Sequence, residues 1–285
     1  MVSILLNIGS EYQGYKVVSI DDPLIPILYE DKTKNCFDLL ENQYLLIVDA
    51  NGLPVDRYKW QDGKLKNVYK KPVESSQMGK IKAKNPEQEF ALDMLMDDSI
   101  TVKLLTGPFG CGKTYLCACA AYQLMQAGKF DKIVWIRNNI EVKDTNSIGA
   151  LPGSYLEKMS IWAMPLADHL GGRDELEKQI GFGRIEIEHL GFLRGRDIKH
   201  SLIICSEAEH LTREHVQLLL GRVAEGSVLI LEGDCRQIDA KAFEKDNGLV
   251  AAISRLRGNR LFAYVHLKES VRSETAKLAD LLNNP

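Results

Sequence analysis

The segment from Gly107 to Thr114 has the residue types and spacing of a phosphate-binding loop. It reads GPFGCGKT and consists of Gly107, Pro108, Phe109, Gly110, Cys111, Gly112, Lys113 and Thr114. Its glycines allow consecutive backbone N–H groups to turn inward around a β-phosphate, and the helix that follows adds the positive end of its dipole. Lys113 can reach the β and γ oxygens, and the Thr114 hydroxyl can coordinate Mg²⁺. The segment therefore predicts nucleotide binding at all eight positions, with Lys113 also acting in catalysis.

The surroundings of this loop support the interpretation. The apolar run VKLLT precedes it and a helical pattern follows it, which is the context that the motif requires. A tight strand-to-helix turn with an incidental lysine and threonine is the structural alternative. A dinucleotide-binding loop fits less well, because the Gly-x-Gly-x-x-Gly pattern is absent here.

A second apolar run, SLIICSE, ends in an acid that suits hydrolysis. Hydrolysis needs a group that orients a water molecule opposite the leaving group, and in α/β folds it stands at the end of a neighbouring parallel strand. Glu207 closes this run and is the candidate. The structural alternative is a helix start capped by Ser206 and Glu209. With the phosphate loop present, catalysis by Glu207 is the better interpretation.

Two further segments supply candidates for catalysis. The run SVLILEGDCRQID brings Asp234 and Gln237 to a third strand end, where Gln237 could sense the γ-phosphate through a hydrogen bond. A plain Gly-Asp turn is the alternative. Near the end of the chain, HLKESVRSE offers Arg272 as an arginine finger, in cis or from a neighbouring subunit. Alone, Arg272 would be an ordinary surface arginine.

Alternating strands and helices must position these residues. Apolar runs at 102–107, 132–137, 201–207, 227–233 and 262–267 alternate with helical patterns at 113–128, 154–170, 213–226, 247–258 and 273–282. This alternation predicts an α/β fold with a parallel sheet and helices on both of its faces. The carboxyl ends of the strands then meet at one edge, where the candidate residues converge.

The first seventy or so residues have a different pattern. Short apolar runs alternate with turn signals, including Asn51-Gly52 and Asp62-Gly63, which are strong hairpin signals. We therefore expect a small antiparallel β domain over residues 1–72, a lysine-rich linker over 73–84 and the α/β domain over 85–285. The lysines between residues 64 and 84 form a candidate basic patch, but such charged runs are more often solvated linkers.

Composition limits the remaining classes of function. The net charge is −3, so nucleic-acid binding would depend on a local patch rather than on a global field. The six cysteines form neither a zinc pattern nor a disulfide framework. No apolar run approaches the roughly 20 residues of a membrane helix, and the first residues lack a signal pattern. We expect a cytoplasmic protein with no membrane segment.

In combination, the motifs resemble those of the PhoH family of P-loop ATPases. The matching segments are KNPEQEFALDML, GPFGCGKT, IRNNIEV, SIGALPGSYLEKM, LGFLRGRDI, SLIICSEAEHLT, LEGDCRQID and SVRSE, in the order of the family, over residues 82–282. The resemblance implies a RecA-like core related to superfamily 1 helicases. It also implies ATP as the nucleotide, with Mg²⁺, and RNA or single-stranded nucleic acid as the partner.

The resemblance also assigns expected roles to four residues outside the loop. Gln88 matches the glutamine that reads the adenine edge, a role that suits its bidentate amide. Without the resemblance, NPEQEF would be a helix start with Pro86 in its first turn. Arg137, Arg194 and Arg196 match positions that face phosphates or nucleic acid. Salt bridges within the domain are an equally good interpretation of each arginine.

The chain departs from the family pattern at two positions. Asn138 stands where the family often has proline, a change of little consequence. Ser206 stands where the family has an aspartate that holds Mg²⁺ through a water molecule. The Ser206 hydroxyl can still bond a metal-bound water, but it supplies no negative charge. Asp234 is the candidate to supply that charge.

These observations leave competing functions. The leading hypothesis is an ATPase that remodels RNA or moves along it. Such a protein would act as a homo-oligomer whose neighbouring subunits supply Arg272, and the family resemblance suggests a hexamer. The second hypothesis is a nucleotide-binding switch or scaffold with little hydrolysis, which Ser206 favours. A small-molecule kinase lacks an evident acceptor lid.

The N-terminal region resembles the segment that joins a PIN nuclease domain to the ATPase in longer family members. Seventy residues of hairpins leave no room for a PIN domain, so nuclease activity is not expected from this chain.

Overall fold

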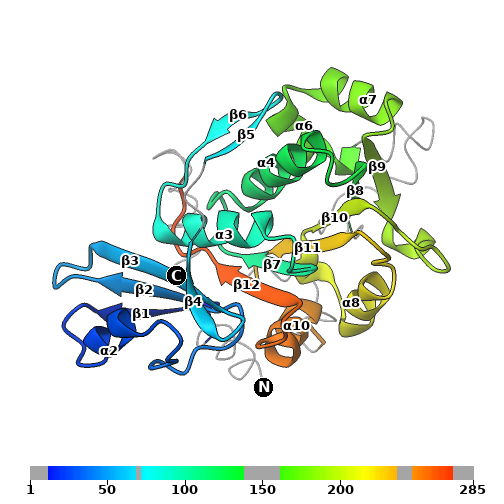
Figure 1. Cartoon of the computed structure of the whole chain (residues 1–285). Coiled ribbons are helices and arrows are strands. Elements are labelled where there is room, and N and C mark those ends of the chain that lie inside the picture. The colour runs from blue at the N-terminus through cyan, green and yellow to red at the C-terminus, as the bar shows by residue number, and fades with distance from the viewer. Residues whose placement is uncertain (1–11, 69–71, 138–160, 236–245, 272–285) are drawn as a thin grey trace, which may run out of the picture.

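A six-stranded parallel sheet forms the centre of the larger part of the molecule. In the computed structural model, residues 12–68, 72–137, 161–235 and 246–271 are described. Within them, the sheet has the order β12-β7-β11-β10-β8-β9 (Figure 1). Its strands are β7 (Val102–Thr106), β8 (Lys132–Arg137), β9 (Ile185–His189), β10 (Ser201–Ser206), β11 (Val228–Gly233) and β12 (Phe262–His266). All neighbouring pairs are parallel, which confirms the expected α/β fold.

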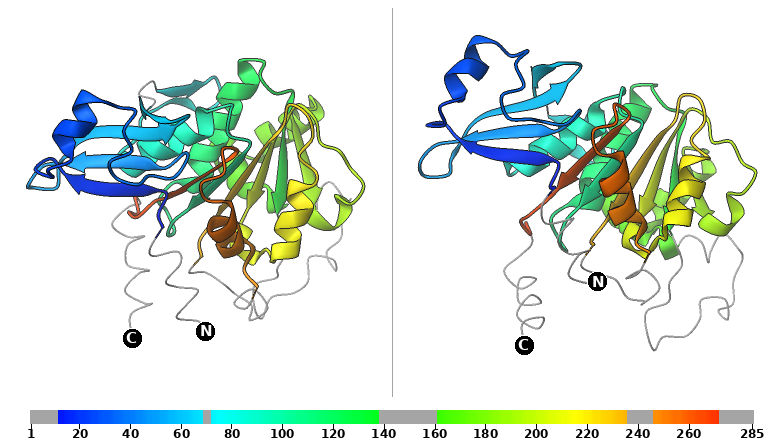
Figure 2. Two further views of the ribbon diagram at one scale, coloured as in Figure 1. Left: turned by 60° about the horizontal axis from the view of Figure 1, so that its bottom comes forward. Right: turned by 90° about the horizontal axis from the view of Figure 1, so that it is seen from below.

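Helices cover both faces of this sheet (Figure 2). One face packs against α3 (Pro86–Met96), α4 (Lys113–Gln126), α6 (Met164–Leu170) and α7 (Arg173–Gly181). The other face packs against α8 (Arg213–Leu220) and α10 (Gly248–Leu256). The near-continuous Val, Ile and Leu runs of the inner strands are what burial on two faces requires. Strand β9 and helix α7 were not expected from the sequence. None of the described helices is long and apolar enough to cross a bilayer.

The alternation of side chains in β10 and β11 decides which residues face α4. Leu202 and Ile204 of β10, and Ile230 of β11, belong to the core that contains α4. Their neighbours along each strand belong to the opposite core. Because side chains alternate with a period of two, the last members of the α4-facing series are Ser206 and Glu232. The two strand ends therefore present these residues to the phosphate loop.

The N-terminal sheet is mixed rather than wholly antiparallel. Its strands are β1 (Tyr15–Ser19), β2 (Tyr44–Val48), β3 (Pro54–Gln61) and β4 (Lys64–Asn67), in that order. The two hairpins expected at the Asn-Gly and Asp-Gly turns are confirmed, whereas β1 pairs with β2 in parallel.

The apolar run IPILYE forms helix α2 (Ile25–Glu30), and not a strand. Pro26 suits a first helical turn, and Ile25 and Leu28 are buried at helical spacing. A helix between β1 and β2 also supplies the crossover that a parallel pair requires.

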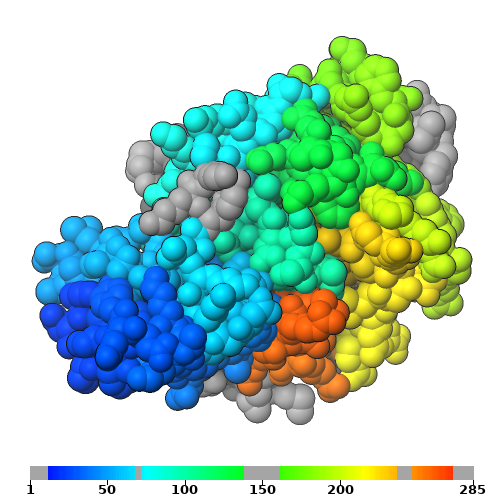
Figure 3. Space-filling model, in the orientation of Figure 1, coloured from blue at the N-terminus to red at the C-terminus, as the bar shows by residue number. Residues whose placement is uncertain are grey.

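This N-terminal part packs against α3 and β12 of the α/β part (Figure 3). The Asn42 amide donates to the carbonyl of Phe262 at 3.0 Å, and the Tyr44 hydroxyl donates to Asp93 Oδ2 at 2.8 Å. Lys59, which is almost wholly buried, pairs with Asp93 and Asp97 at 2.7 Å each. Buried polar contacts of this kind fix the position of one part on the other.

The segment expected to be a solvated linker contains a short hairpin. Strands β5 (Val73–Ser75) and β6 (Gly79–Ile81) pair in an antiparallel manner. Val73 and Ile81 are buried in the core beside α4, and the backbone N–H of Glu74 donates to Gln123 Oε1 at 2.8 Å. The hairpin is thus part of the packed structure, although Lys80 and other residues near the turn are exposed. The division of the chain at residues 72 and 84 stays a prediction.

Candidate nucleotide site

The phosphate loop joins β7 to α4 in a conformation that depends on its glycines. A Cβ at Gly107 would lie 2.6 Å from the carbonyl oxygen of Leu267 and 2.8 Å from Cys111 Sγ. Gly112 precedes α4 with φ of 93°, in the left-handed region that other residues rarely adopt. Side chains at these two positions would displace the loop. The glycine spacing in the sequence therefore reflects both packing and backbone conformation.

The Lys113 side chain folds over the loop. Its Nζ donates to the carbonyl oxygens of Gly107 at 2.8 Å and Pro108 at 3.2 Å. These bonds hold the ammonium group above the loop, where phosphate oxygens bind in this class of site. Phe109, about half exposed, lies at the rim of the same pocket. The backbone N–H of Val271 donates to the carbonyl of Gly110 at 3.0 Å, so the end of the described chain reaches the loop.

Gln88 lies behind the loop. It is buried, its Nε2 donates to the carbonyl of Cys111 at 3.0 Å, and its Oε1 accepts from the backbone N–H of Lys84 at 2.9 Å. Its backbone N–H donates to Asn85 Oδ1 at 3.0 Å, which caps α3. The amide thus braces the loop from α3, and its expected contact with adenine stays a prediction.

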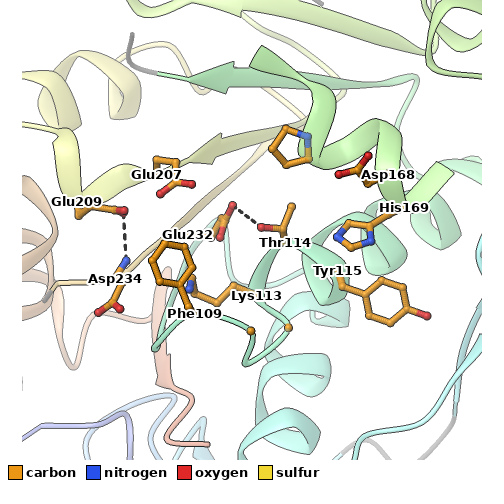
Figure 4. Close-up of a pocket in the computed structure, with 13 residues that line it drawn as sticks. Phe109, Lys113, Thr114, Tyr115, Asp168, His169, Glu207, Glu209, Glu232 and Asp234 are labelled. Carbon is orange, nitrogen blue, oxygen red and sulfur yellow. Dashed lines mark hydrogen bonds between the residues drawn. The ribbon is translucent and has the colours of Figure 1, made fainter. Parts of the chain in front are cut away.

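Glu232 lies next to Thr114, and the sequence analysis did not select it. Thr114 Oγ1 donates to Glu232 Oε1 at 2.9 Å (Figure 4). Ser206 forms a hydrogen bond with the same carboxylate, and both residues are almost wholly buried. Burial raises the pKa of Glu232, while the charge of Lys113 and the bonds from Ser206 and Thr114 oppose that rise. A lone acid in the apolar run SVLILEG was the signal that could have revealed it.

Glu207 faces the pocket from the end of β10, as expected. Its backbone is in the left-handed region, with φ of 52°, which is unusual for a residue other than glycine. Arg137 Nη2 lies 3.4 Å from Glu207 Oε1. Burial opposes ionisation of Glu207, but the hydrogen bond from Glu209 and the charges of Arg137 and Lys113 hold its pKa below the ordinary value. Glu207 is therefore a carboxylate at neutral pH.

Glu209 supports Glu207 from behind. Burial and the hydrogen bond to Glu207 raise the pKa of Glu209, so its carboxyl group keeps a proton and donates it. Its Oε2 accepts from the backbone N–H of Asp234 at 3.1 Å. Gly233 leaves room for this carboxyl group, since a Cβ there would lie 2.2 Å from Oε2. Position 233 therefore requires glycine for a close approach, and not for a simple turn.

Helix capping does not account for the acids of this segment. Thr212 caps α8 through a bond from the backbone N–H of His215 to Oγ1. Glu207 precedes a short 3₁₀ turn, Ala208–His210, without a capping bond from its side chain. The capping alternative for Ser206 and Glu209 is therefore wrong, because the helix begins seven residues after Ser206.

These residues line one cavity of about 370 Å³. Lys113, Thr114, Glu207 and Asp234 meet there as the sequence predicted, and Figure 4 shows them around the loop. The opposite wall comes from α6 and includes residues that the sequence analysis did not select, namely Asp168 and His169. The His169 ring contacts Tyr115.

The oxygen atoms in this cavity suit a magnesium ion. Thr114 supplies a hydroxyl group and Glu232 a carboxyl group at the cavity wall, and Ser206 bonds the Glu232 carboxyl group from the adjacent strand. Mg²⁺ prefers such hard oxygen ligands and keeps several waters of its own. The residues present therefore fit the metal that a phosphate loop uses.

The other residues that the sequence selected form ion pairs, are exposed, or lie outside the described residues. Arg196 pairs with Glu186 at 2.7 Å and also with Glu188, and Arg194 is exposed. The salt-bridge interpretation thus holds for Arg196 and also for Arg137, which pairs with Glu207. Gln237, Arg272 and Asn138 lie outside the described residues.

The parallel sheet, the loop between β7 and α4 and the acid at the end of β10 define a P-loop nucleotide-binding protein. Residues 80–282 match the family model of the PhoH-like proteins. The chain therefore belongs to the PhoH family, as its motifs indicated.

Curated relatives extend the match. Protein PhoH2 of Bacillus subtilis (strain 168) is 34% identical over 288 residues, which cover 95% of this chain and 64% of that protein. Protein PhoH2 of Mycolicibacterium smegmatis is 33% identical over 201 residues, covering 70% of this chain and 46% of that protein. The chain thus spans about half to two thirds of the length of these relatives.

Two helicases of known structure are distantly similar. Pif1 helicase from Candida albicans aligns with 72% of this chain and 44% of its own, at a TM-score of 0.38 and 16% identity. Bacteroides sp Pif1 in complex with ADP-AlF4 aligns with 72% of this chain and 46% of its own, at a TM-score of 0.38 and 14% identity. Neither similarity is close enough to inform the function.

Proposed function

We propose that the protein hydrolyses ATP in this cavity and couples hydrolysis to remodelling of RNA or another single-stranded nucleic acid. The observation that carries the first half of the proposal is the position of Glu207. It is an ionised carboxylate that lines the same cavity as Lys113 and Thr114. A phosphate loop alone binds nucleotide, whereas a carboxylate beside it can orient the attacking water.

Each described residue then has a task in hydrolysis. The loop N–H groups and Lys113 would bind and orient the phosphates, and Thr114 would hold the metal. When bound, Mg²⁺ neutralises charge on the phosphate oxygens. Glu207 orients water and accepts its proton, and Arg137 fixes the direction of the carboxylate. Buried Glu209 keeps Glu207 ionised by donating a hydrogen bond to it.

Further roles rest on the sequence and the family. We propose that Gln88 reads the adenine edge, that Gln237 senses the γ-phosphate, and that Arg272 acts as an arginine finger, in cis or from a neighbouring subunit. A homo-oligomer, with a hexamer as the working assumption, would place such a finger in each site. Arg194 is the best candidate for a nucleic-acid contact because its side chain is exposed.

Phosphate release from ATP, with and without single-stranded RNA, tests the proposal. We expect Mg²⁺-dependent turnover that RNA stimulates, and loss of turnover in Lys113→Ala. The exposed Lys199→Ala is the matched control, because Lys199 precedes β10 at the end of the strand opposite the cavity and its loss removes an equal charge. Absence of turnover in the wild-type chain would contradict the first half of the proposal, and turnover that RNA leaves unchanged would contradict the second.

A nucleotide-binding switch with negligible hydrolysis is the second candidate, and Ser206 favours it. The family aspartate at this position carries a negative charge that serine lacks. In this case, tight nucleotide binding would persist while turnover stayed at background. Comparing the affinity for nucleotide with the turnover of the same preparation distinguishes the two functions.

A further inference from the structure

The geometry points to Glu232 as the acid that supports the magnesium ion in this chain, in place of the acid that the family places at position 206. The inference rests on the proposed function only in that a nucleotide binds the loop. It assigns the missing negative charge to Glu232, in the neighbouring strand β11, rather than to Asp234, which follows that strand. Ser206 then becomes a hydrogen-bonding partner of the acid, and not a sign of a defective site.

The strand order favours an acid at this position. Strand β11 lies between β7, which leads into the phosphate loop, and β10, which carries Ser206. An acid at the end of β11 is therefore one strand closer to the loop than an acid on β10. Adjacent strands lie about 4.8 Å apart. Glu232 reaches Thr114 directly, with 2.9 Å between the hydroxyl and the carboxylate oxygen.

The register brings the two exchanged positions together. Cys205 of β10 pairs with Leu231 of β11, so the next residues, Ser206 and Glu232, are also neighbours. Both face α4, and the Ser206 side chain bonds the Glu232 carboxylate. One of the two positions holds an acid and the other a small hydroxyl residue. Of these two neighbouring positions, the acid is therefore on β11 in this chain, and the hydroxyl residue is on β10.

Burial gives this carboxylate a need for a cation. Glu232 is 2% exposed, and a buried charge is costly unless a counter-charge or several hydrogen bonds offset it. The hydroxyl groups of Thr114 and Ser206 supply hydrogen bonds, and Lys113 lies close enough to interact through its charge. Lys113 is committed to phosphate oxygens when nucleotide is present. A divalent cation beside Thr114 would then balance Glu232.

Asp234 fits this role less well. It follows the last residue of β11 by one position, and the observed contact of its backbone is with Glu209. Glu232, in contrast, already contacts Thr114, whose hydroxyl group would ligate the metal. We therefore assign the metal-supporting charge to Glu232.

Mg²⁺-dependent binding of a fluorescent ADP analogue tests the inference without requiring hydrolysis. In Glu232→Gln, the Mg²⁺ concentration for half-maximal binding should rise about 10–100-fold, while binding in EDTA stays at the wild-type level. Glu225→Gln is the matched control, since Glu225 is exposed and away from the cavity. The isosteric change removes a buried charge, so circular dichroism should show a folded Glu232→Gln chain.

Exchanging the two positions gives a second readout. Ser206→Asp alone would place two carboxylates side by side and should not lower the Mg²⁺ requirement. The double variant Ser206→Asp, Glu232→Gln restores one carboxylate and should recover most of the affinity that Glu232→Gln loses.

Three outcomes would overturn the inference. They are a Glu232→Gln chain with the Mg²⁺ requirement of the wild type, a Ser206→Asp chain that needs less Mg²⁺ than the wild type, and a double variant no better than Glu232→Gln. A wild-type chain that binds nucleotide with Mg²⁺ but does not hydrolyse it would overturn the proposed function alone.

Discussion

Arg137 Nη2 lies 3.4 Å from Glu207 Oε1, at the ends of the adjacent parallel strands β8 and β10. For Arg137, the sequence offered only a match to a family position. For Glu207, it predicted a place at the end of a strand. The effect of the pair is to keep Glu207 ionised despite burial. This relationship leads to a prediction about the pH dependence of turnover.

Removing the positive charge of Arg137 should shift the acid limb of the pH profile. The pKa of Glu207 lies below its ordinary value in part because of Arg137, so Arg137→Ala should raise it. The carboxylate then protonates at a higher pH, and activity falls sooner as the pH is lowered. Arg137→Lys keeps the charge and serves as the control. An acid limb of kcat/KM that is the same in Arg137→Ala and in the wild type would show that the pair has no electrostatic role.

Gly233→Ala should destabilise the protein and disturb the site. The new Cβ would lie 2.2 Å from Glu209 Oε2 and 3.0 Å from the Glu209 backbone nitrogen, and overpacking of this kind costs about 1–3 kcal/mol. Gly181→Ala, in helix α7 and with open space around its Cβ, is the control. It should leave stability unchanged or raise it by up to about 1 kcal/mol. Urea unfolding measures both, and equal midpoints would refute the close approach.

Lys59→Met should destabilise the contact between the two parts of the molecule. Lys59 pairs with Asp93 and Asp97 at 2.7 Å each, and its loss would leave buried carboxylates without their cation. Breaking a buried pair in this way costs about 3–5 kcal/mol. Unfolding monitored by circular dichroism at neutral pH measures the loss. Lys34→Met is the control and should have little effect, because Lys34 is exposed and its ion pair with Asp31 is long, at 4.0 Å.

The same cluster should make stability sensitive to acid. Burial opposes ionisation of Asp97, but hydrogen bonds from Lys59, Ser99 and Gln61 hold its pKa below the ordinary value. A lowered pKa in the folded state adds stability above the unfolded pKa of about 4, and this stability is lost as the pH falls below that value. In Lys59→Met the loss on acidification should be smaller. An equal loss in both proteins would place the acid-sensitive group elsewhere.

The arginines of the segment after β9 should separate into two kinds. Arg194→Ala should weaken RNA binding and reduce the slope of log K against log salt by about one unit, because Arg194 is exposed. Arg196→Ala should lower thermal stability instead, since Arg196 pairs with Glu186 and Glu188. RNA binding over a range of salt concentrations, with thermal melts of both variants, tests this. An unchanged slope in Arg194→Ala would remove it as a phosphate contact.

The sequence predicted what depends on local pattern. The inner strands of the sheet are long apolar runs, and the phosphate loop has its own spacing, so both were found where they lie. Glu207 was found because the ends of parallel strands converge. Helix α2 was missed because a short apolar run has no clear period, and only the burial of Ile25 and Leu28 distinguishes helix from strand.

Other features depend on contacts between distant segments. The position of Glu232 in the site depends on the strand order and on its register with Ser206, and the sequence of a single strand reveals neither. The hairpin of β5 and β6 depends on packing against α4. Strand β9, with the alternating sequence IEIEH, is an edge strand whose acids pair with Arg196 and Lys132. Such pairings become visible only when the chain is folded.

In the proposed function, Glu207 is the base that orients water for the hydrolysis of ATP in this cavity. The most direct test compares Glu207→Gln with the wild type, measuring ADP and ATP affinity together with steady-state phosphate release at saturating Mg²⁺ and ATP. We predict that affinity is retained and that phosphate release falls about 10²–10⁴-fold. Phosphate release by Glu207→Gln at the wild-type rate would show that Glu207 is not the base.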